Sequence, residues 1–331
     1  MTGATGFVGS AVARALARRG HPLRLLVRGA TSRTLDRRNL EGLEAEIVQG
    51  DLTDPASLAR AVAGCRYVFH VAADYRIWVP RPAAMVAANV EGTRALMRAA
   101  IAAGVERVVY CSSVAALGLT GTAAPADETT PADRDHIVGV YKRSKYDAEQ
   151  VVRRMVADEG LPAVIVNPST PVGPRDRKPT PTGKMILDAA SGRMPAYVDT
   201  GLNIVHVDDV AEGHCLALER GRIGEAYILG GQNFTMPEML ALIDDVTGHP
   251  QRRLRLPVGA LVPLAVACEG WARLTGWTPL VTRDHLRMAR KLMFFSSAKA
   301  EAELGYVPRP ARRAIADAVA WFADHGRMAR P

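Results

Sequence analysis

Short runs of apolar, β-branched residues alternate with alanine-rich stretches through the first two-thirds of this 331-residue chain. The runs predict strands at 23–28, 46–51, 67–73, 107–113 and 163–168, and the stretches predict helices at 9–19, 55–63, 84–103 and 141–159. Strands that are apolar almost throughout are typical of a parallel sheet buried on both faces. The sequence therefore predicts an α/β fold, a doubly wound parallel sheet covered by helices.

The alternation changes beyond residue 168. Residues 170–183 are rich in proline and glycine, and we predict a loop there. Residues 203–221 and 224–231 add one more helix and one more strand, and the chain from 232 is predicted to be helical with proline-rich breaks.

Composition excludes several classes of protein. Hydrophobic residues make up 48% of the chain and charged residues 23%, as in soluble globular proteins. The net charge of +8 comes mostly from scattered arginines, and aromatic residues are only 5%. A nucleic-acid surface needs a basic stripe with interleaved aromatics, so we expect no nucleic-acid partner.

The longest apolar run, 258–268, contains a proline and is too short to span a bilayer. This run could still form an apolar lid or rest on a membrane surface. Cys65, Cys111, Cys215 and Cys268 lie far apart without metal or redox spacing. We therefore expect four buried reduced thiols in a cytoplasmic protein, and no metal site.

The segment TGATGFVG (2–9) has the form of a phosphate-binding turn. Gly3 would permit a tight turn, Gly6 a close approach of the backbone to a pyrophosphate, and Gly9 close packing of the helix that follows. The N–H groups at the start of that helix would face the phosphates. The segment therefore predicts a dinucleotide site.

Such a turn normally follows the central strand of the sheet, and only Met1 precedes the segment here. We expect the numbered chain to begin late, with an apolar β-branched run of about six residues upstream, the usual strand length. The alternative is a true truncation, which would leave two inner strand edges unpaired.

The end of the strand at 23–28 discriminates between the two nicotinamide cofactors. A carboxylate there binds the adenosine ribose of NAD, whereas an arginine accommodates the 2′-phosphate of NADP. Arg28 stands at this position, Ser32 and Arg33 follow, and no acidic residue occurs from 10 to 35. We therefore predict NADP(H), with NAD(H) disfavoured.

The segment YKRSK places Tyr141 and Lys145 on one face of a predicted helix. An ammonium group beside a phenol favours the phenolate and lowers the phenol's pKa, which would make Tyr141 a usable acid or base. Ser113, at the end of the strand at 107–113, could hydrogen-bond a substrate oxygen. These three residues predict proton transfer at a carbinol or carbonyl oxygen.

The chain resembles the extended short-chain dehydrogenase/reductases, the NAD-dependent epimerase/dehydratase superfamily, almost from end to end. The motifs that carry the resemblance are TGATGFVG (2–9), GDLTD (50–54), HVAA (70–73), NVEGT (89–93), CSSVAALG (111–118), YKRSK (141–145), NPSTPVGP (167–174), VHVDDVA (205–211) and SSAKAEAELGYVPRP (296–310).

This resemblance implies a catalytic set of Ser113, Tyr141 and Lys145, with Asn89 bracing the site. It implies cofactor contacts from Gly3, Thr5, Gly6, Phe7, Val8, Gly9, Arg28, Ser32, Arg33, Asp51, Leu52, Ala72, Ala73, Tyr141, Lys145, Pro168, Ser169 and Thr170. Tyr75 and Trp78 would face the substrate together with Ser113 and Tyr141.

The resemblance also implies a domain division. Residues 1–168 would form an NADP-binding Rossmann domain, completed by about 203–231. Residues 169–202 and 232–331 would form a smaller, C-terminal substrate-binding part. Within VHVDDVA we expect His206 to be a helix-entry or packing residue, and Asp208 and Asp209 to cap the helix rather than bind metal.

Three functions stay open at this level. Dehydratases of the family carry an acidic pair after the catalytic Ser or Thr, and Val114 and Ala115 stand here. With Arg28 and the basic residues near it, the chain resembles the dihydroflavonol-4-reductase branch of the family. This resemblance implies an NADP(H)-dependent oxidoreductase acting on a secondary alcohol or ketone. The segment 73–78 and the C-terminal half are similar to hopanoid-associated sugar epimerases. A sugar-nucleotide epimerase and a non-catalytic NADP-sensing protein are therefore the alternatives, and a homodimer is left open.

Overall fold

The computed structural model describes the chain except for residues 30–36, 75–81, 276–278, 280, 290 and 329–331. Its main sheet contains six parallel strands: β1 (Arg24–Val27), β2 (Glu46–Gln49), β3 (Tyr67–His70), β4 (Arg107–Cys111), β5 (Ala163–Pro168) and β9 (Ala226–Leu229). β2 pairs with β1, and the other four follow in the order β3-β4-β5-β9. Thr2 bridges both Leu26 of β1 and His70 of β3, and so joins the two groups. This is the predicted Rossmann-type α/β fold.

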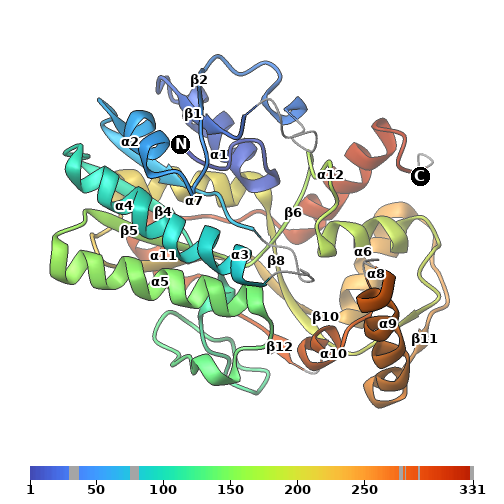
Figure 1. Cartoon of the computed structure of the whole chain (residues 1–331). Helices are drawn as coiled ribbons and strands as arrows, with labels where there is room; N and C mark the ends of the chain where they lie inside the picture. The colour runs from blue at the N-terminus through green and yellow to red at the C-terminus, as the bar shows by residue number, and fades with distance from the viewer. Residues whose placement is uncertain (30–36, 75–81, 276–278, 280, 290, 329–331) are drawn as a thin grey trace.

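Helices cover both faces of this sheet (Figure 1). They are α1 (Phe7–Arg18) and α7 (Val207–Arg220) on one face, and α2 (Pro55–Val62), α4 (Gly92–Ala102) and α5 (Val140–Glu159) on the other. Each face has its own apolar core, because alanine, valine and leucine recur at helical spacing and pack on strands that are largely buried apart from the edge strand β2.

One predicted helix, 84–103, is interrupted. The structure has α3 (Pro82–Val86), a π-helical turn η2 (Ala87–Glu91) and then α4. π-helical turns are often found at functional sites, and this one contains Asn89.

A second, smaller sheet is formed by β6 (Thr170–Val172), β8 (Gly201–His206), β10 (Gln232–Thr235) and β12 (Leu292–Met293). β8 is its centre, with β10 antiparallel to it and β6 and β12 parallel. The helices α6 (Pro181–Ala190), α8 (Met236–Thr247) and α12 (Ala311–Asp324) pack against this sheet around a separate apolar core.

The remaining elements connect or flank these two sheets. They are β7 (Ala196–Tyr197) with β11 (Leu254–Arg255), the helices α9 (Val262–Thr275), α10 (Arg283–Ala289) and α11 (Ala298–Leu304), and the 3-10 turns η1 (Arg38–Leu40), η3 (Val114–Ala116), η4 (Arg134–His136) and η5 (Val258–Leu261). Among the described residues, no helix is long and apolar enough to cross a membrane.

Three sequence predictions were wrong in this part of the chain. Residues 170–183 are not all loop, because β6 pairs with β8 and α6 begins at Pro181 behind an N-cap from Thr180. Proline is tolerated in β6 because this short strand pairs on one side, with β8. Residues 201–206 form a strand before α7, and the chain beyond 232 contributes strands β10, β11 and β12 as well as helices.

The thiol prediction was also wrong in part. All four cysteines are free, and Cys111 and Cys215 are buried. Cys65 and Cys268 are only partly buried. Cys65 lies just after the end of α2, and Cys268 lies on α9, which faces solvent on one side.

Candidate functional site

The glycine turn between Thr2 and α1 is tightly packed against the end of β3. Gly3 has φ +79°, and a Cβ there would lie 2.6 Å from the backbone nitrogen of Ala72. A Cβ at Gly9 would collide with the carbonyl group of Gly3, and a Cβ at Gly6 would lie 3.3 Å from the same oxygen. Gly6 is the N-cap of α1, so no side chain covers the first N–H groups of the helix.

Residues 1 and 2 hold the place of the central strand. The carbonyl of Met1 accepts a 2.8 Å hydrogen bond from the Leu26 N–H, and the Thr2 N–H donates to the Phe69 carbonyl at 2.9 Å. Both inner strand edges are thus paired at the position from which the glycine turn departs.

Beneath the turn, a buried hydrogen-bonded line connects Thr2 to Asn89 through His70 and Thr93. The Thr93 hydroxyl donates to the Asn89 carbonyl at 2.6 Å, so it must accept from Nε2 of His70, 2.9 Å away. Nδ1 of His70 then accepts from the Thr2 hydroxyl at 2.8 Å. Burial, with the nearby Lys145 and N-terminal ammonium groups, lowers the pKa of His70 to about 3.

Asn89 connects the chain after β3 to α5. Its Nδ2 donates to the Asp74 carbonyl and to Oγ of Ser144, both at 2.9 Å, and its Oδ1 accepts from the Asp74 N–H at 2.8 Å. The Ser144 hydroxyl donates in turn to the carbonyl of Tyr141 at 2.7 Å. The π-helical turn therefore places Asn89 against the helix that carries Tyr141 and Lys145.

Helix α5 is attached to the end of β4 on one face, where Tyr141, Lys145 and Glu149 recur every four residues. The buried Lys145 ammonium donates to the Cys111 carbonyl at 2.8 Å and lies 5.0 Å from the centre of the Tyr110 ring. Burial lowers the pKa of Lys145. The interaction of the ammonium with a backbone carbonyl leaves it with donors still available.

Glu149 is a buried carboxylate one turn beyond Lys145, with 2% of its side chain exposed. Its Oε2 accepts from the Ser112 hydroxyl at 2.6 Å and from Nδ2 of Asn167 at 2.8 Å, and Arg153 pairs with its Oε1 at 2.8 Å. Asn167 also donates to the Ser113 carbonyl at 3.0 Å. Glu149 therefore holds the Ser112 side chain directly and the Ser113 carbonyl through Asn167.

Ser113 itself begins the 3-10 turn η3, which packs against α5. Its Oγ accepts from the Ala115 N–H at 3.1 Å. Glu149, Asn167 and His70 were not singled out from the sequence. The spacing of four from Lys145 to Glu149 was a usable signal, whereas the roles of Asn167 and His70 depend on contacts between distant segments.

The residues predicted to contact the adenosine end lie at the ends of β1 and β2. Arg28 is exposed directly after β1. Asp51 accepts from the N–H and hydroxyl of Thr53 at 2.9 and 2.7 Å. Burial acts to raise the pKa of Asp51, but the Thr53 hydrogen bonds and the charge of Arg28 hold it below its usual value. Leu52 fits against Gly92, where a Cβ would lie 2.8 Å from that of Leu52.

The other predicted cofactor residues border the same turn or the end of β5. Phe7 and Val8 form the first turn of α1, and the Thr5 carbonyl accepts from Nδ2 of the buried Asn39 at 3.2 Å. Ala73 follows Ala72 after β3. Pro168 ends β5, Ser169 donates its N–H to the Leu229 carbonyl at 3.2 Å, and Thr170 begins β6.

Four predicted residues, Ser32, Arg33, Tyr75 and Trp78, lie outside the described residues. Of the rest, the structure brings Ser113, Tyr141, Lys145 and Asn89 together through α5, β4 and η2. A cavity is lined by Asp199, Thr200, Thr235, Pro237, Arg255, Ala289 and Leu292. None of these lining residues belongs to the predicted catalytic set.

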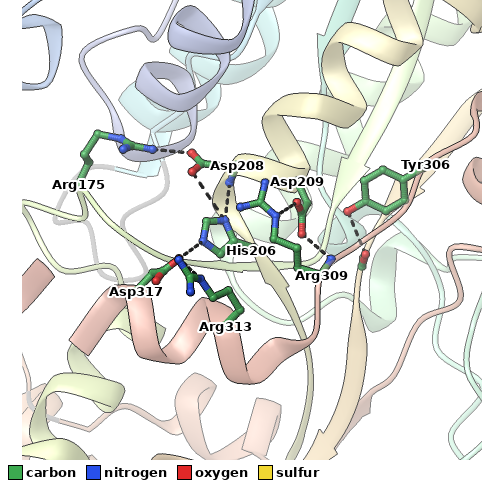
Figure 2. A network of polar contacts seen from close by, with 9 residues as sticks. Arg175, His206, Asp208, Asp209, Tyr306, Arg309, Arg313 and Asp317 are labelled. Carbon is green, nitrogen blue, oxygen red and sulfur yellow. Dashed lines mark hydrogen bonds and ion pairs between the residues drawn. The ribbon is translucent and has the colours of Figure 1, made fainter. Parts of the chain in front are cut away.

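His206 is the helix-entry residue that the sequence predicted (Figure 2). Its Nδ1 accepts from the Asp208 N–H at 3.0 Å, and its Nε2 lies 3.2 Å from Asp317. The capping role expected for the two aspartates was wrong, because His206 caps the helix. Asp208 pairs with Arg175 at 2.5 Å and Asp209 with Arg309 at 2.7 Å. Among the described residues, no group of three His, Cys, Asp or Glu is placed to hold a metal ion.

The residues present fit a dinucleotide. The turn is built from glycines that side chains would fill, and the N-terminus of α1 is left without a capping side chain or an acidic first turn. The hydroxyl of Ser169 is buried without a hydrogen-bond partner in the described structure, at the strand end where a nicotinamide is expected.

Comparison with known proteins agrees with this geometry. The family model described as "NAD dependent epimerase/dehydratase family" matches residues 1–230. A Synechocystis sp. protein named as a dihydroflavonol 4-reductase is 43% identical over 330 residues, covering 98% of this chain and 94% of that protein. Sterol demethylase protein B of Methylococcus capsulatus is 36% identical over 330 residues, covering 99% of each.

Among solved structures, the crystal structure of a protein called gox2253 is 61% identical with a TM-score of 0.88, covering 99% of this chain and 98% of that one. A family model that spans all six strands of the main sheet, and relatives aligned over almost the whole chain, settle the family. This chain belongs to the NAD-dependent epimerase/dehydratase family of extended short-chain dehydrogenase/reductases.

Proposed function

We propose that this protein is an NADP(H)-dependent oxidoreductase that interconverts a ketone and a secondary alcohol. The observation that carries the proposal is the double attachment of α5 to the end of β4. Lys145 bonds to the residue two before Ser113 and Glu149 to the residue one before it. A serine hydroxyl, a tyrosine and a buried ammonium group are thereby held on adjoining elements.

The roles follow from the chemistry of each group. Bound nicotinamide would supply or accept the hydride. Tyr141 would give a proton to the substrate oxygen during reduction, or take one during oxidation. Ser113 would orient that oxygen by donating a hydrogen bond. The cation of Lys145 would stabilise the phenolate form of Tyr141, since an adjacent positive charge favours the charged form of an acid.

We favour NADP(H) over NAD(H) because an arginine, Arg28, stands exposed directly after β1. Its positive charge acts on Asp51, which follows the neighbouring strand β2. A guanidinium group can pair with the 2′-phosphate that distinguishes the two cofactors. The 1–168 segment with α7 and β9 would bind this cofactor, and the second sheet with its helices would bind the substrate.

The substrate class that we propose is a bulky, largely apolar ketone or alcohol. Two relatives that align over almost the entire chain carry names that refer to a dihydroflavonol and to a sterol. The dihydroflavonol and the sterol in these names are molecules with several fused or linked rings, and each carries an oxygen substituent on a ring carbon. No acidic pair follows Ser113, which disfavours dehydration of a sugar nucleotide.

The second candidate is epimerisation of a sugar nucleotide with a tightly held cofactor, which the same residues would support and which the family description includes. A non-catalytic NADP-sensing role is the third. The test is oxidation of added NADPH in the presence of flavanonols, steroid ketones and sugar nucleotides. Stoichiometric NADPH consumption supports the reductase, isomer formation without consumption supports the epimerase, and no turnover supports the sensor.

A further inference from the structure

One face of α9 is apolar and exposed. Trp271 and Leu274 have 60% and 84% of their surface exposed, and Leu264 has 48%. Together with Ala267 these residues are spaced three and four apart, so they share one side of the helix. A surface helix normally turns polar residues to that side. We refer to Leu264, Ala267, Trp271 and Leu274 as the α9 face.

The opposite side of α9 is what holds the helix to the protein. Ala265 and Ala272 are buried, and so is Glu269. Glu269 accepts from the N–H of Arg283 at 2.6 Å and pairs with its guanidinium at 2.9 Å, which fixes α9 against α10. Glu269 is the one acidic residue in the sequence of α9, so the α9 face carries no negative charge.

The segment around the α9 face is strongly basic. Residues 251–291 contain eight Lys and Arg but only two Asp and Glu, so they carry six of the eight net positive charges of the chain. Asp199 and Asp244 pair with Arg255 and Arg253 from outside the segment, and a surplus of four remains after both are counted. The sequence of this segment is therefore net positive even after these two pairs are counted.

These elements lie together at one end of the molecule. Figure 1 shows α9, α8 and β11 at the end away from β1 and β2. On β11, Leu254 is 71% exposed and its neighbour Arg255 is also exposed. An apolar helix face with basic residues beside it is the combination that helices lying in a membrane interface use.

We propose that the α9 face docks on the surface of an anionic lipid bilayer, with Trp271 and Leu274 entering the headgroup region and the exposed basic residues Arg252, Arg255 and Lys291 facing the lipid phosphates and carboxylates. Charge complementarity selects this occupant. A second copy of the chain would place two strongly basic segments against each other, which costs free energy. A bilayer bearing anionic lipids attracts Lys and Arg near its surface.

The test is sedimentation of the full chain with vesicles of phosphatidylcholine alone and with about 30% phosphatidylserine added. It needs neither cofactor nor substrate, so its outcome is independent of the proposed function. We expect binding to the anionic vesicles that weakens with salt, and much weaker binding to the neutral ones. Trp271→Ser/Leu274→Ser should bind at least about tenfold more weakly, because the inserted apolar surface is lost.

The matched control is Ile223→Ser/Val307→Ser, which removes two side chains that are 51% and 82% exposed outside this segment. It should bind like the wild type. Leu274→Glu, at the most exposed position, provides a second variant that disturbs no core contact, and Arg252→Gln/Lys291→Gln tests the charge.

Three results would overturn the proposal. The wild type binds neither vesicle, the folded Trp271→Ser/Leu274→Ser and Leu274→Glu variants bind as tightly as the wild type, or the control weakens binding equally. A dimer in analytical ultracentrifugation that the variants dissociate, without vesicle binding, would instead assign the α9 face to a second copy.

Discussion

The ammonium group of Lys145 donates a 2.8 Å hydrogen bond to the carbonyl oxygen of Cys111, two residues before Ser113. This contact joins the second turn of α5 to the last residue of β4. It fixes the position of a buried cation relative to Ser113 without using the ammonium's full set of donors. The remaining donors are available to Tyr141 or to a cofactor hydroxyl, which is the arrangement that the proposed reaction requires.

Replacing Glu149 should destabilise the fold. Glu149→Ala leaves the buried Ser112 hydroxyl, the Asn167 amide and Arg153 without their shared acceptor. Breaking a buried pair in this way costs about 3–5 kcal/mol, so the free energy of unfolding measured in urea should fall by that amount. The control is Glu106→Ala, whose pair with Arg66 is exposed on both sides. A loss of less than about 1 kcal/mol in Glu149→Ala, as expected for a surface pair, would contradict the role given to Glu149.

Reversing the charge at Arg28 should change cofactor preference. Arg28→Asp removes a charge-assisted contact to the 2′-phosphate, worth about 1.5–3 kcal/mol, so NADPH should bind at least tenfold more weakly while NADH binding improves. Titration calorimetry with both cofactors measures this. The control is Arg98→Asp on the exposed side of α4, which should leave both affinities unchanged. Equal affinity of the wild type for NADPH and NADH would refute the assignment of Arg28.

A methyl group at Gly9 should damage both the fold and the dinucleotide site. A Cβ there collides with the Gly3 carbonyl, so Gly9→Ala must push α1 away from the glycine turn. We expect a loss of about 1–3 kcal/mol in stability, typical of overpacking, together with weaker NADPH binding. The control is Gly270→Ala, a helical position with no atom within 4 Å of the added Cβ, where stability should stay equal or rise. An unperturbed Gly9→Ala would show that the turn is not packed as described.

Acid should destabilise the protein through His70. The folded state keeps His70 neutral with a pKa of about 3, whereas the unfolded chain has the ordinary value of 6.5. The unfolded state therefore binds more protons below pH 6.5, and the stability present above that pH is lost as pH falls toward 3. From pH 6.5 to about pH 4 the loss should be about 3 kcal/mol.

Urea unfolding at several pH values measures this loss, to which the buried His214, whose pKa burial lowers to about 4, also contributes. His70→Asn should be less stable at neutral pH and less dependent on pH below 6.5. His136→Asn, at an exposed position, is the control and should keep the wild-type profile. A His70→Asn variant with the full wild-type pH dependence would contradict the neutral, buried state of His70.

Local patterns were sufficient for the main sheet and for the glycine turn. The strand at 163–168 matches β5 residue for residue, and the helix predicted at 141–159 differs from α5 by one residue. In apolar runs and alanine-rich stretches of this length, the spacing of apolar residues distinguishes a strand from a helix. The role of Gly9 also followed from its spacing, because close helix packing at the third glycine is a local requirement.

What the sequence did not reveal depends on contacts between distant segments. β6 was predicted as loop because it contains Pro171 and is followed by Gly173, and only pairing with β8 makes it a strand. The acceptor role of Glu149 requires Ser112, directly after β4, and Asn167 of β5. The line from Thr2 through His70 to Asn89 joins three segments up to 87 residues apart, and no local pattern encodes it.

The central claim is that Tyr141 transfers the proton in a reduction driven by NADPH. The most direct measurement is NADPH oxidation by the wild type and Tyr141→Phe with the ketone found to be the best substrate, alongside NADPH affinity for both proteins. We predict that Tyr141→Phe lowers kcat by about 10²–10⁴-fold, the usual contribution of a positioned acid, while NADPH affinity changes little because the ring is retained. Wild-type turnover in Tyr141→Phe would show that another group supplies the proton and would contradict the account.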